Sequence, residues 1–140
     1  MDCSFDLPSL DARTLQGENL RMIAVENVSS LELHDPGSAA AAVYDRSIGL
    51  RVLNEDADSG EEHYVVHYPA GTTGRAHRHT AAHTMIVLEG RLEANGRTFG
   101  PGSYVHFEAG ETMKHQAAGD DGCLFVLLFH SPFDVTIDEG

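Results

Sequence analysis

The stretch "GTTGRAHRHTAAHTMIVLEG", residues 71–90, places three histidines within seven positions, directly ahead of an apolar run that ends on a glycine. Alternate residues of a β-strand point to the same face, so His77 and His79 are expected to project together. Imidazole is a good ligand for iron, manganese, nickel, copper and zinc. Several buried neutral imidazoles would otherwise lack hydrogen-bond partners. The spacing therefore predicts a metal site.

Two further imidazoles are expected at this site. The strand predicted over residues 83–90 starts with His83, and a bend at residues 80–82 would set that ring opposite the first pair. His115 follows two further predicted strands, and a closed sheet would return it to the same interior. Other histidines lack such spacing and are interpreted as surface or internally satisfied groups: His34, His63, His67 and His130.

The rest of the chain alternates short apolar segments with turns that are rich in glycine, proline and acidic residues. The predicted strands cover residues 48–54, 62–68, 83–90, 91–94, 97–99, 103–108 and 123–130. The pair Asn95-Gly96 is a hairpin signal between two of them. Alanines 39–42 have helix propensity, but their run is too short for a stable helix. Short strands at this spacing predict an antiparallel sandwich or barrel.

Residues 71–90 resemble the first motif of the cupin family, in which a glycine, five residues and H-x-H are followed by a glutamate and a closing glycine. The glycines and the pair His77 and His79 are in register, and His83 stands where most members have glutamate. A subset of cupins has this H-x-H-x3-H spacing. The resemblance implies an all-β, single-domain jelly-roll barrel (a double-stranded β-helix) that holds a metal through these histidines.

A second stretch, "GPGSYVHFEAGETMKHQA" at residues 100–117, is similar to the cupin segment that supplies the last metal histidine. It departs from the family pattern, because Glu108 replaces the proline of P-x-G and four residues, not two, precede His115. Strict counting would place Met113 at the ligand position. We assign His115 instead, since a longer turn can deliver it and a thioether is a poor ligand for hard cations.

The resemblance covers residues 43–133, so we divide the chain into a lead-in, residues 1–42, and a cupin barrel, residues 43–140. The lead-in is expected to pack on the barrel or extend it. The formal net charge of -13 argues against nucleic-acid and membrane partners. No apolar run reaches the roughly 20 residues of a membrane span, and no signal peptide is evident, so a cytoplasmic protein is expected. Covering of an exposed sheet edge by a second copy predicts a homodimer.

The resemblance extends to small cupins that include acetylacetone- and dihydroxyacetophenone-cleaving dioxygenases and the cupin halves of anti-sigma regulators. It implies a non-haem iron dioxygenase that cleaves a C–C bond in a small diketone, hydroxyketone or phenolic substrate. The expected cofactor is one divalent metal per chain, with Fe²⁺ favoured and Mn²⁺, Ni²⁺ or Zn²⁺ as alternatives, held by His77, His79, His83 and His115. Candidates for the substrate pocket are Met85, Val87, Phe99, Tyr104, His106, Phe107 and Phe125.

Four neutral ligands would make the site one unit more positive than a set that contains glutamate, which strengthens binding of anionic oxygen donors. A six-coordinate metal would keep two adjacent positions open for substrate. Two other classes of function stay open. The protein could be a cupin isomerase or lyase that uses the metal only as a Lewis acid, or a metal-containing binding or regulatory module without turnover.

Overall fold

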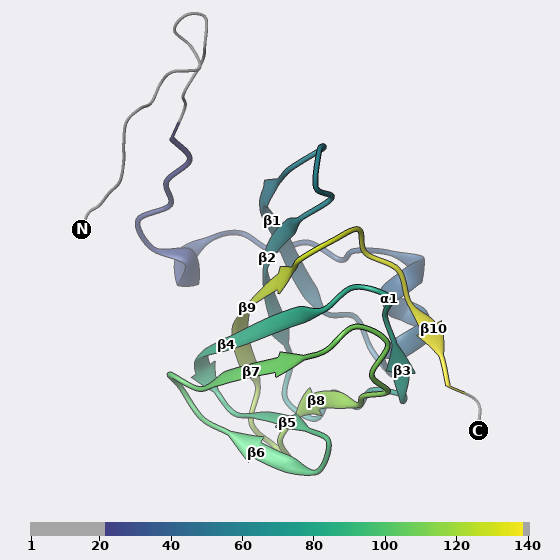
Figure 1. Ribbon diagram of the computed structural model, residues 1–140. Helices are drawn as coiled ribbons and strands as arrows, with labels where there is room; N and C mark the ends of the chain where they lie inside the picture. The colour runs from purple at the N-terminus through teal and green to yellow at the C-terminus, as the bar shows by residue number, and fades with distance from the viewer. Residues whose placement is uncertain (1–21, 139–140) are drawn as a thin grey trace, which may run out of the picture.

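The computed structural model describes residues 22–138, which form short strands with little helix (Figure 1). The strands are β1 (Gly49–Glu55), β2 (Glu62–Tyr68), β3 (His77–Arg78), β4 (His83–Gly90), β5 (Leu92–Ala94), β6 (Arg97–Phe99), β7 (Tyr104–Phe107), β8 (His115–Ala117), β9 (Cys123–Phe129) and β10 (Thr136–Ile137). The helices are η1 (Val28–Ser30), a 3-10 turn, and α1 (Ser38–Val43). The predicted all-β fold is confirmed, and each predicted strand agrees with an observed one to within one residue at either end.

Two sheets and a short strand pair make up the described fold (Figure 1). One sheet has five strands in the order β1-β2-β9-β4-β7, the other has three in the order β6-β5-β8, and β10 pairs with β3. All strand pairings within residues 22–138 are antiparallel. Register aligns Val66, Phe125 and Val87 across three neighbouring strands of the large sheet. These side chains are buried and form the centre of the hydrophobic core.

Gly90 ends β4 at a point where only glycine fits. Its φ is +73°, a left-handed conformation that other residues adopt at a cost. A Cβ at this position would overlap the carbonyl group of Gly122, which accepts a hydrogen bond from the amide of Arg91 at 3.1 Å. The closing glycine of the histidine motif therefore lets the backbone after β4 pass close to the start of β9.

Helix α1 corrects the prediction for residues 39–42, which were expected to form no stable helix. Propensity alone does not account for it, because isolated helices of this length are unstable in water. Tertiary contacts anchor its C-terminal end: the amide of Arg75 donates to the carbonyl of Val43 at 2.8 Å, and Asp45 donates to that of Thr73 at 3.0 Å. These bonds attach α1 to the loop that precedes β3.

The described part of the lead-in runs along the edge of the large sheet. His34 and Leu50 exchange two backbone hydrogen bonds, of 3.0 and 2.8 Å, which add a short bridge to the outer strand β1. Residues 1–21 of the lead-in lie outside the described residues. Within residues 22–138, none of the helices has the length and apolar character that crossing a membrane requires.

Candidate metal centre

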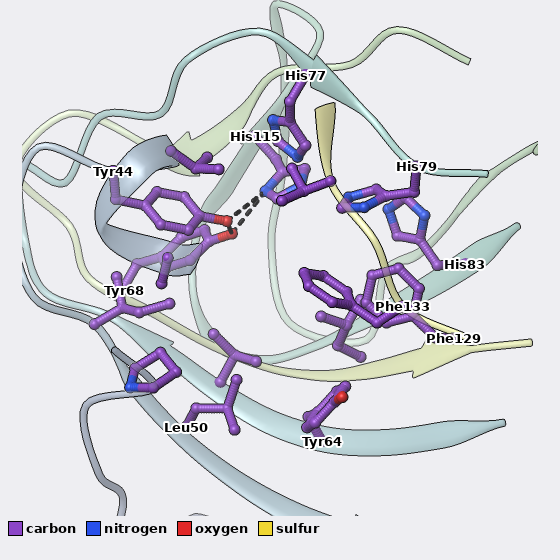
Figure 2. Close-up of a pocket in the computed structure, with 17 residues that line it drawn as sticks. Tyr44, Leu50, Tyr64, Tyr68, His77, His79, His83, His115, Phe129 and Phe133 are labelled. Carbon is purple, nitrogen blue, oxygen red and sulfur yellow. Dashed lines mark hydrogen bonds between the residues drawn. The ribbon is translucent and has the colours of Figure 1, made fainter. Parts of the chain in front are cut away.

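Three histidines meet at one end of the fold, although two of them are separated from the third by more than thirty residues. His77 belongs to β3, His79 follows it, and His115 begins β8. One ring nitrogen from each lies within 4.8 Å of the others, and all three side chains are buried. Figure 2 shows the imidazoles gathered on one side of a pocket. The shared face of His77 and His79 follows from alternation along an extended chain.

Hydrogen bonds on the outer side of the first two rings set which nitrogen faces the cluster. Nδ1 of His77 donates to the carbonyl oxygen of Arg75 at 2.8 Å, and Nδ1 of His79 donates to that of Asp134. Each Nε2 then carries a lone pair, as a metal ligand requires. The Asp134 carboxylate accepts hydrogen bonds from the amide and hydroxyl of Thr80, both at 2.8 Å, which hold this carbonyl in place.

His115 reaches the cluster because the segment just before its strand β8 forms a bridge with β3 in the first motif. The amide of His77 donates to the carbonyl of Met113, and Met113 donates back to His77, both at 2.8 Å. His115 lies two residues further on, so its ring returns to the side on which the bridge with β3 forms. The longer turn after β7 absorbs the two additional residues. Met113 itself packs in the hydrophobic core.

The Nδ1 atom of His115 is held by two tyrosine hydroxyls. Tyr68 Oη lies 2.6 Å from it and Tyr44 Oη lies 3.2 Å away, while the two hydroxyl oxygens are 2.5 Å apart (Figure 2). The Nε2 atom on the opposite side of the ring is buried and has no hydrogen-bond partner among the described residues. Burial raises the pKa of both phenols, so they keep their hydrogens at neutral pH.

His83 is fully buried beside the three clustered histidines. Its ring stacks between Phe107, at 5.2 Å between centroids, and Phe129, at 4.9 Å. The His83 centroid lies 4.9 Å from that of His79 and 6.2 Å from that of His115. Neither nitrogen of His83 has a hydrogen-bond partner within residues 22–138. An imidazole in this position offers a fourth lone pair beside the group of three.

Burial lowers the pKa of all four histidines, because it disfavours the charged imidazolium. The pKa of His83 falls to about 3, with further lowering by the neighbouring rings of His79 and His77. The pKa of His115 is well below its ordinary value for the same reasons. The cluster is therefore a set of neutral imidazoles at physiological pH.

A cavity of about 240 Å³ opens beside the histidines (Figure 2). It is lined by Pro36, Ala40, Val43, Tyr44, Ile48, Leu50, Tyr64, Val66, Tyr68, His77, His79, His83, His115, Leu127, Phe129, Phe133 and Val135. Among the described residues, the lining holds no lysine, arginine, aspartate or glutamate. The described part of the lead-in contributes Pro36 and Ala40 to this wall. The polar groups of the cavity are the imidazoles and the tyrosine hydroxyls.

None of the seven residues predicted to wall the pocket is among those that line this cavity. Buried in the core or packed against it are Met85, Val87, Phe99, Phe107 and Phe125. Two others lie on the opposite face of the large sheet. Tyr104 is 68% exposed, and His106 bonds the Thr84 hydroxyl through Nδ1 at 2.8 Å. Thr84 alternates with the inward-pointing His83 on β4, and its pairing with His106 places that ring on the outer face.

Apart from the four histidines, sequence reasoning missed the residues that line the cavity. On β2, Tyr64, Val66 and Tyr68 alternate along one face, a period-2 pattern that could have identified them as inward-pointing. Tyr44 carries no comparable signal, because it follows a helix that the sequence alone does not predict. Its place beside His115 depends on the backbone bonds that attach α1 to the loop before β3.

An antiparallel jelly-roll barrel with clustered imidazoles at the wall of an internal pocket defines a cupin with a candidate metal centre. The chain belongs to the ChrR cupin-like domain family, whose sequence profile matches residues 38–134. This confirms the cupin resemblance of the histidine motif. No curated protein sequence matches the chain significantly.

Solved structures show the same fold at low identity. A cupin-like protein of Thermotoga maritima is similar with a TM-score of 0.68 at 18% identity, over 78% of this chain and 87% of its own. An acetylacetone dioxygenase of Acinetobacter johnsonii is similar with a TM-score of 0.67 at 18% identity, over 100% of this chain and 87% of its own. A chain in the Rhodobacter sphaeroides complex of SigE with the anti-sigma ChrR is similar with a TM-score of 0.57 at 14% identity, over 74% of this chain and 50% of its own.

The residues at the centre fit a bound cation. Both nitrogens of His83 and Nε2 of His115 are buried without hydrogen-bond partners among the described residues, which is costly unless something binds them. Two nitrogens that each lie about 2.1 Å from one cation are at most about 4.2 Å apart. Small side-chain rotations would bring the three clustered nitrogens, now within 4.8 Å, to that spacing.

Proposed function

We propose that this protein is a non-haem iron dioxygenase that cleaves a C–C bond in a small diketone, hydroxyketone or phenolic ketone. The observation that carries the proposal is the position of the imidazole cluster at the wall of an apolar cavity without charged side chains. The fold similarity to an acetylacetone dioxygenase supports the same substrate class. His77, His79 and His115 would hold the metal, and His83 would be the fourth ligand.

The cavity favours substrates that carry no charge when they enter. A charged group that lies away from the metal would lose its hydration there without gaining a cationic side chain as a partner, at a cost of several kcal/mol. A small diketone has apolar ends that match Leu50 and Leu127, and two oxygens that can turn toward the histidines. The volume of about 240 Å³ restricts the substrate to a small molecule.

A bound iron would supply a Lewis acid for the substrate oxygens and a redox centre for dioxygen. The chain's own residues would bind the substrate and shield the histidine cluster from water. The rings of Phe129 and Phe133, 5.0 Å apart, lie next to His79 and exclude water from that side of the cluster. Neutral imidazoles leave the positive charge of the cation uncompensated, which favours a substrate that becomes an enolate at the site.

A regulatory or binding module is a second candidate, because the family profile is that of the ChrR cupin-like domain and the fold is similar to the chain in the SigE complex. In that function the same cavity would hold a small ligand without converting it. An isomerase or lyase that uses the metal as a Lewis acid would turn substrate over without dioxygen.

Oxygen consumption separates these functions. Protein purified without a polyhistidine tag is loaded anaerobically with Fe²⁺ and given acetylacetone, a dihydroxyacetophenone or, as a charged comparison, a dicarboxylate. We expect oxygen uptake with the first two classes alone, and none with a His77→Ala variant. Product without oxygen uptake would favour the isomerase or lyase. Saturable binding without product would favour the module.

We further propose that the protein works as a cytoplasmic homodimer with a small-molecule substrate and without nucleic-acid or membrane partners. The net charge of -13 supports the exclusion of anionic surfaces. Light scattering at micromolar concentration tests the assembly, and a monomer in that measurement would contradict it.

A further inference from the structure

The contact of His115 with two tyrosines forms a closed triangle of polar atoms. Tyr44 follows α1, Tyr68 ends β2 and His115 begins β8, so three separate elements contribute one group each. The edges measure 2.5 Å between the hydroxyl oxygens, 2.6 Å from Tyr68 to Nδ1, and 3.2 Å from Tyr44 to Nδ1. All three residues line the cavity.

The hydrogens in this triangle can be counted. When Nε2 of His115 binds a cation, its Nδ1 must carry the ring hydrogen and becomes a donor. Both phenols keep their hydrogens, since their ordinary pKa is about 10. Nδ1 donates to a hydroxyl oxygen, and one hydroxyl donates to the other. The second hydroxyl hydrogen has no acceptor left, because Nδ1 no longer offers a lone pair.

In the opposite tautomer of His115, every hydroxyl hydrogen has an acceptor. With the hydrogen on Nε2, Nδ1 accepts from one hydroxyl, and the second hydroxyl donates to the first. All three polar atoms are then satisfied within the triangle, but the Nε2–H group points into the histidine cluster and excludes a cation there. When Nε2 binds a cation, one hydroxyl therefore has a hydrogen without an acceptor in the triangle.

Tyr44 is the residue that presents this hydrogen to the cavity. Nδ1 lies closer to Tyr68 than to Tyr44, so Tyr68 accepts from the ring and donates to Tyr44. Tyr68 is 1% exposed, and an unpaired hydroxyl there would be costly. Tyr44 as a residue is only partly buried, and its hydroxyl lies at the pocket beside His115 (Figure 2).

We propose that Tyr44 donates a hydrogen bond to a carbonyl or enolate oxygen of the bound small molecule, and that this donor exists only when Nε2 of His115 is engaged. The inference rests on the proposed metal site. It makes Tyr44 a substrate-binding residue and Tyr68 a positioning residue for His115. Metal and oxygen-bearing ligand would then bind cooperatively, because the first creates a donor for the second.

Binding to zinc-loaded protein tests this without turnover, since Zn²⁺ has no redox chemistry. Calorimetric titration gives the dissociation constant of Zn²⁺ first and of acetylacetone second. We expect Tyr44→Phe to weaken acetylacetone binding roughly ten- to a hundredfold, the range for a hydrogen bond to a charged oxygen. Its Zn²⁺ affinity should stay within about threefold of the wild type. The matched control is Tyr104→Phe, which removes a hydroxyl outside the cavity and should change neither constant.

Tyr68→Phe should instead weaken Zn²⁺ itself, by the roughly 10- to 100-fold typical of losing a group that orients a ligand histidine. Two results would overturn the role of Tyr44 and leave the metal site standing. In the first, zinc-loaded Tyr44→Phe binds acetylacetone as tightly as the zinc-loaded wild type. In the second, the zinc-loaded wild type binds no acetylacetone. Failure of wild-type protein to bind Zn²⁺ would overturn the metal site together with it.

Discussion

The imidazole of His83 stacks on the ring of Phe129 at 4.9 Å between centroids and an interplanar angle of 24°. Stacking satisfies the faces of the imidazole but not its two nitrogens, which have no hydrogen-bond partner among the described residues. A phenylalanine would occupy this place without that cost. The presence of a histidine at this position therefore indicates a role for its nitrogens. Replacement of His83 by phenylalanine separates the contribution of ring packing from that of metal ligation.

His83→Phe is expected to fold, because the new ring keeps the stacking with Phe107 and Phe129. If His83 is a fourth ligand, Zn²⁺ affinity should fall by at least ~10-fold. Even the loss of a group that only hydrogen-bonds to a ligand histidine lowers metal affinity by that factor. The bound stoichiometry should remain one per chain. Calorimetric titration measures both quantities, and an unchanged affinity would restrict the ligand set to the other three histidines.

Metal binding should stabilise the wild-type chain, since the four buried histidines converge only in the folded state. At a free Zn²⁺ concentration 100 times the dissociation constant, the stabilisation is about 2.7 kcal/mol. A rise in melting temperature on adding Zn²⁺ measures it. His79→Ala should abolish the rise, whereas His34→Ala, at an exposed position on the sheet edge, should retain it. Equal rises in both variants would place the metal elsewhere.

The metal-free protein should lose stability as the pH falls below about 6.5. Burial lowers the pKa of the four histidines in the folded chain, so below that pH the unfolded chain binds more protons. The free energy of unfolding then falls by at most ~1.4 kcal/mol per pH unit for each such histidine. The carboxylates with lowered pKa act only below their ordinary values near 4, outside this window.

Urea unfolding between pH 7.5 and 5 checks this expectation. His83→Phe has one buried imidazole fewer, so its free energy of unfolding should decline less steeply than that of the wild type over the same range. A free energy that stays constant from pH 7.5 to 5 in the metal-free wild type would mean that the histidines are hydrated and free to charge.

Gly74→Ala should disturb the metal centre from the outside. A Cβ at Gly74 would lie 2.5 Å from the backbone carbonyl oxygen of His115 and 3.3 Å from the ring of Tyr44. Backbone must move to accommodate it, at a cost of roughly 1–3 kcal/mol. We expect a lower melting temperature and weaker Zn²⁺ binding. Gly100→Ala has no atom within 4 Å of the new Cβ, and it should change neither property.

The alternation of apolar and turn segments was sufficient to predict the strands, because a strand's two faces impose a period of two on its side chains. The hairpin at Asn95-Gly96 is confirmed for the same local reason: both residues have the positive φ values that the turn requires. The predicted ranges omit the short strands β3, β8 and β10, since two or three residues carry little pattern and these strands, unlike β5 and β6, do not flank the Asn95-Gly96 hairpin signal.

The histidine spacing was equally local. The motif alone predicted that His77 and His79 share a face, and the fold brings His115 beside them because Met113, two residues earlier, pairs with His77 of β3. The predicted wall residues are not among those that line the cavity, because alternation tells which residues share a face but not which part of a barrel interior is filled. Met85 and Phe125 face inward as expected, yet the core packs around them.

The sequence by itself determined the strand-rich fold and the spacing of His77, His79 and His83, because both follow from patterns between residues close in the chain. His115 was assigned from the resemblance of its segment to the cupin family. Only the tertiary structure decided which side chains surround the cluster. Tyr44 reaches His115 across 71 positions, through a helix held by backbone bonds to the loop before β3. Contacts of that kind depend on how separate elements pack together, and no local pattern encodes them.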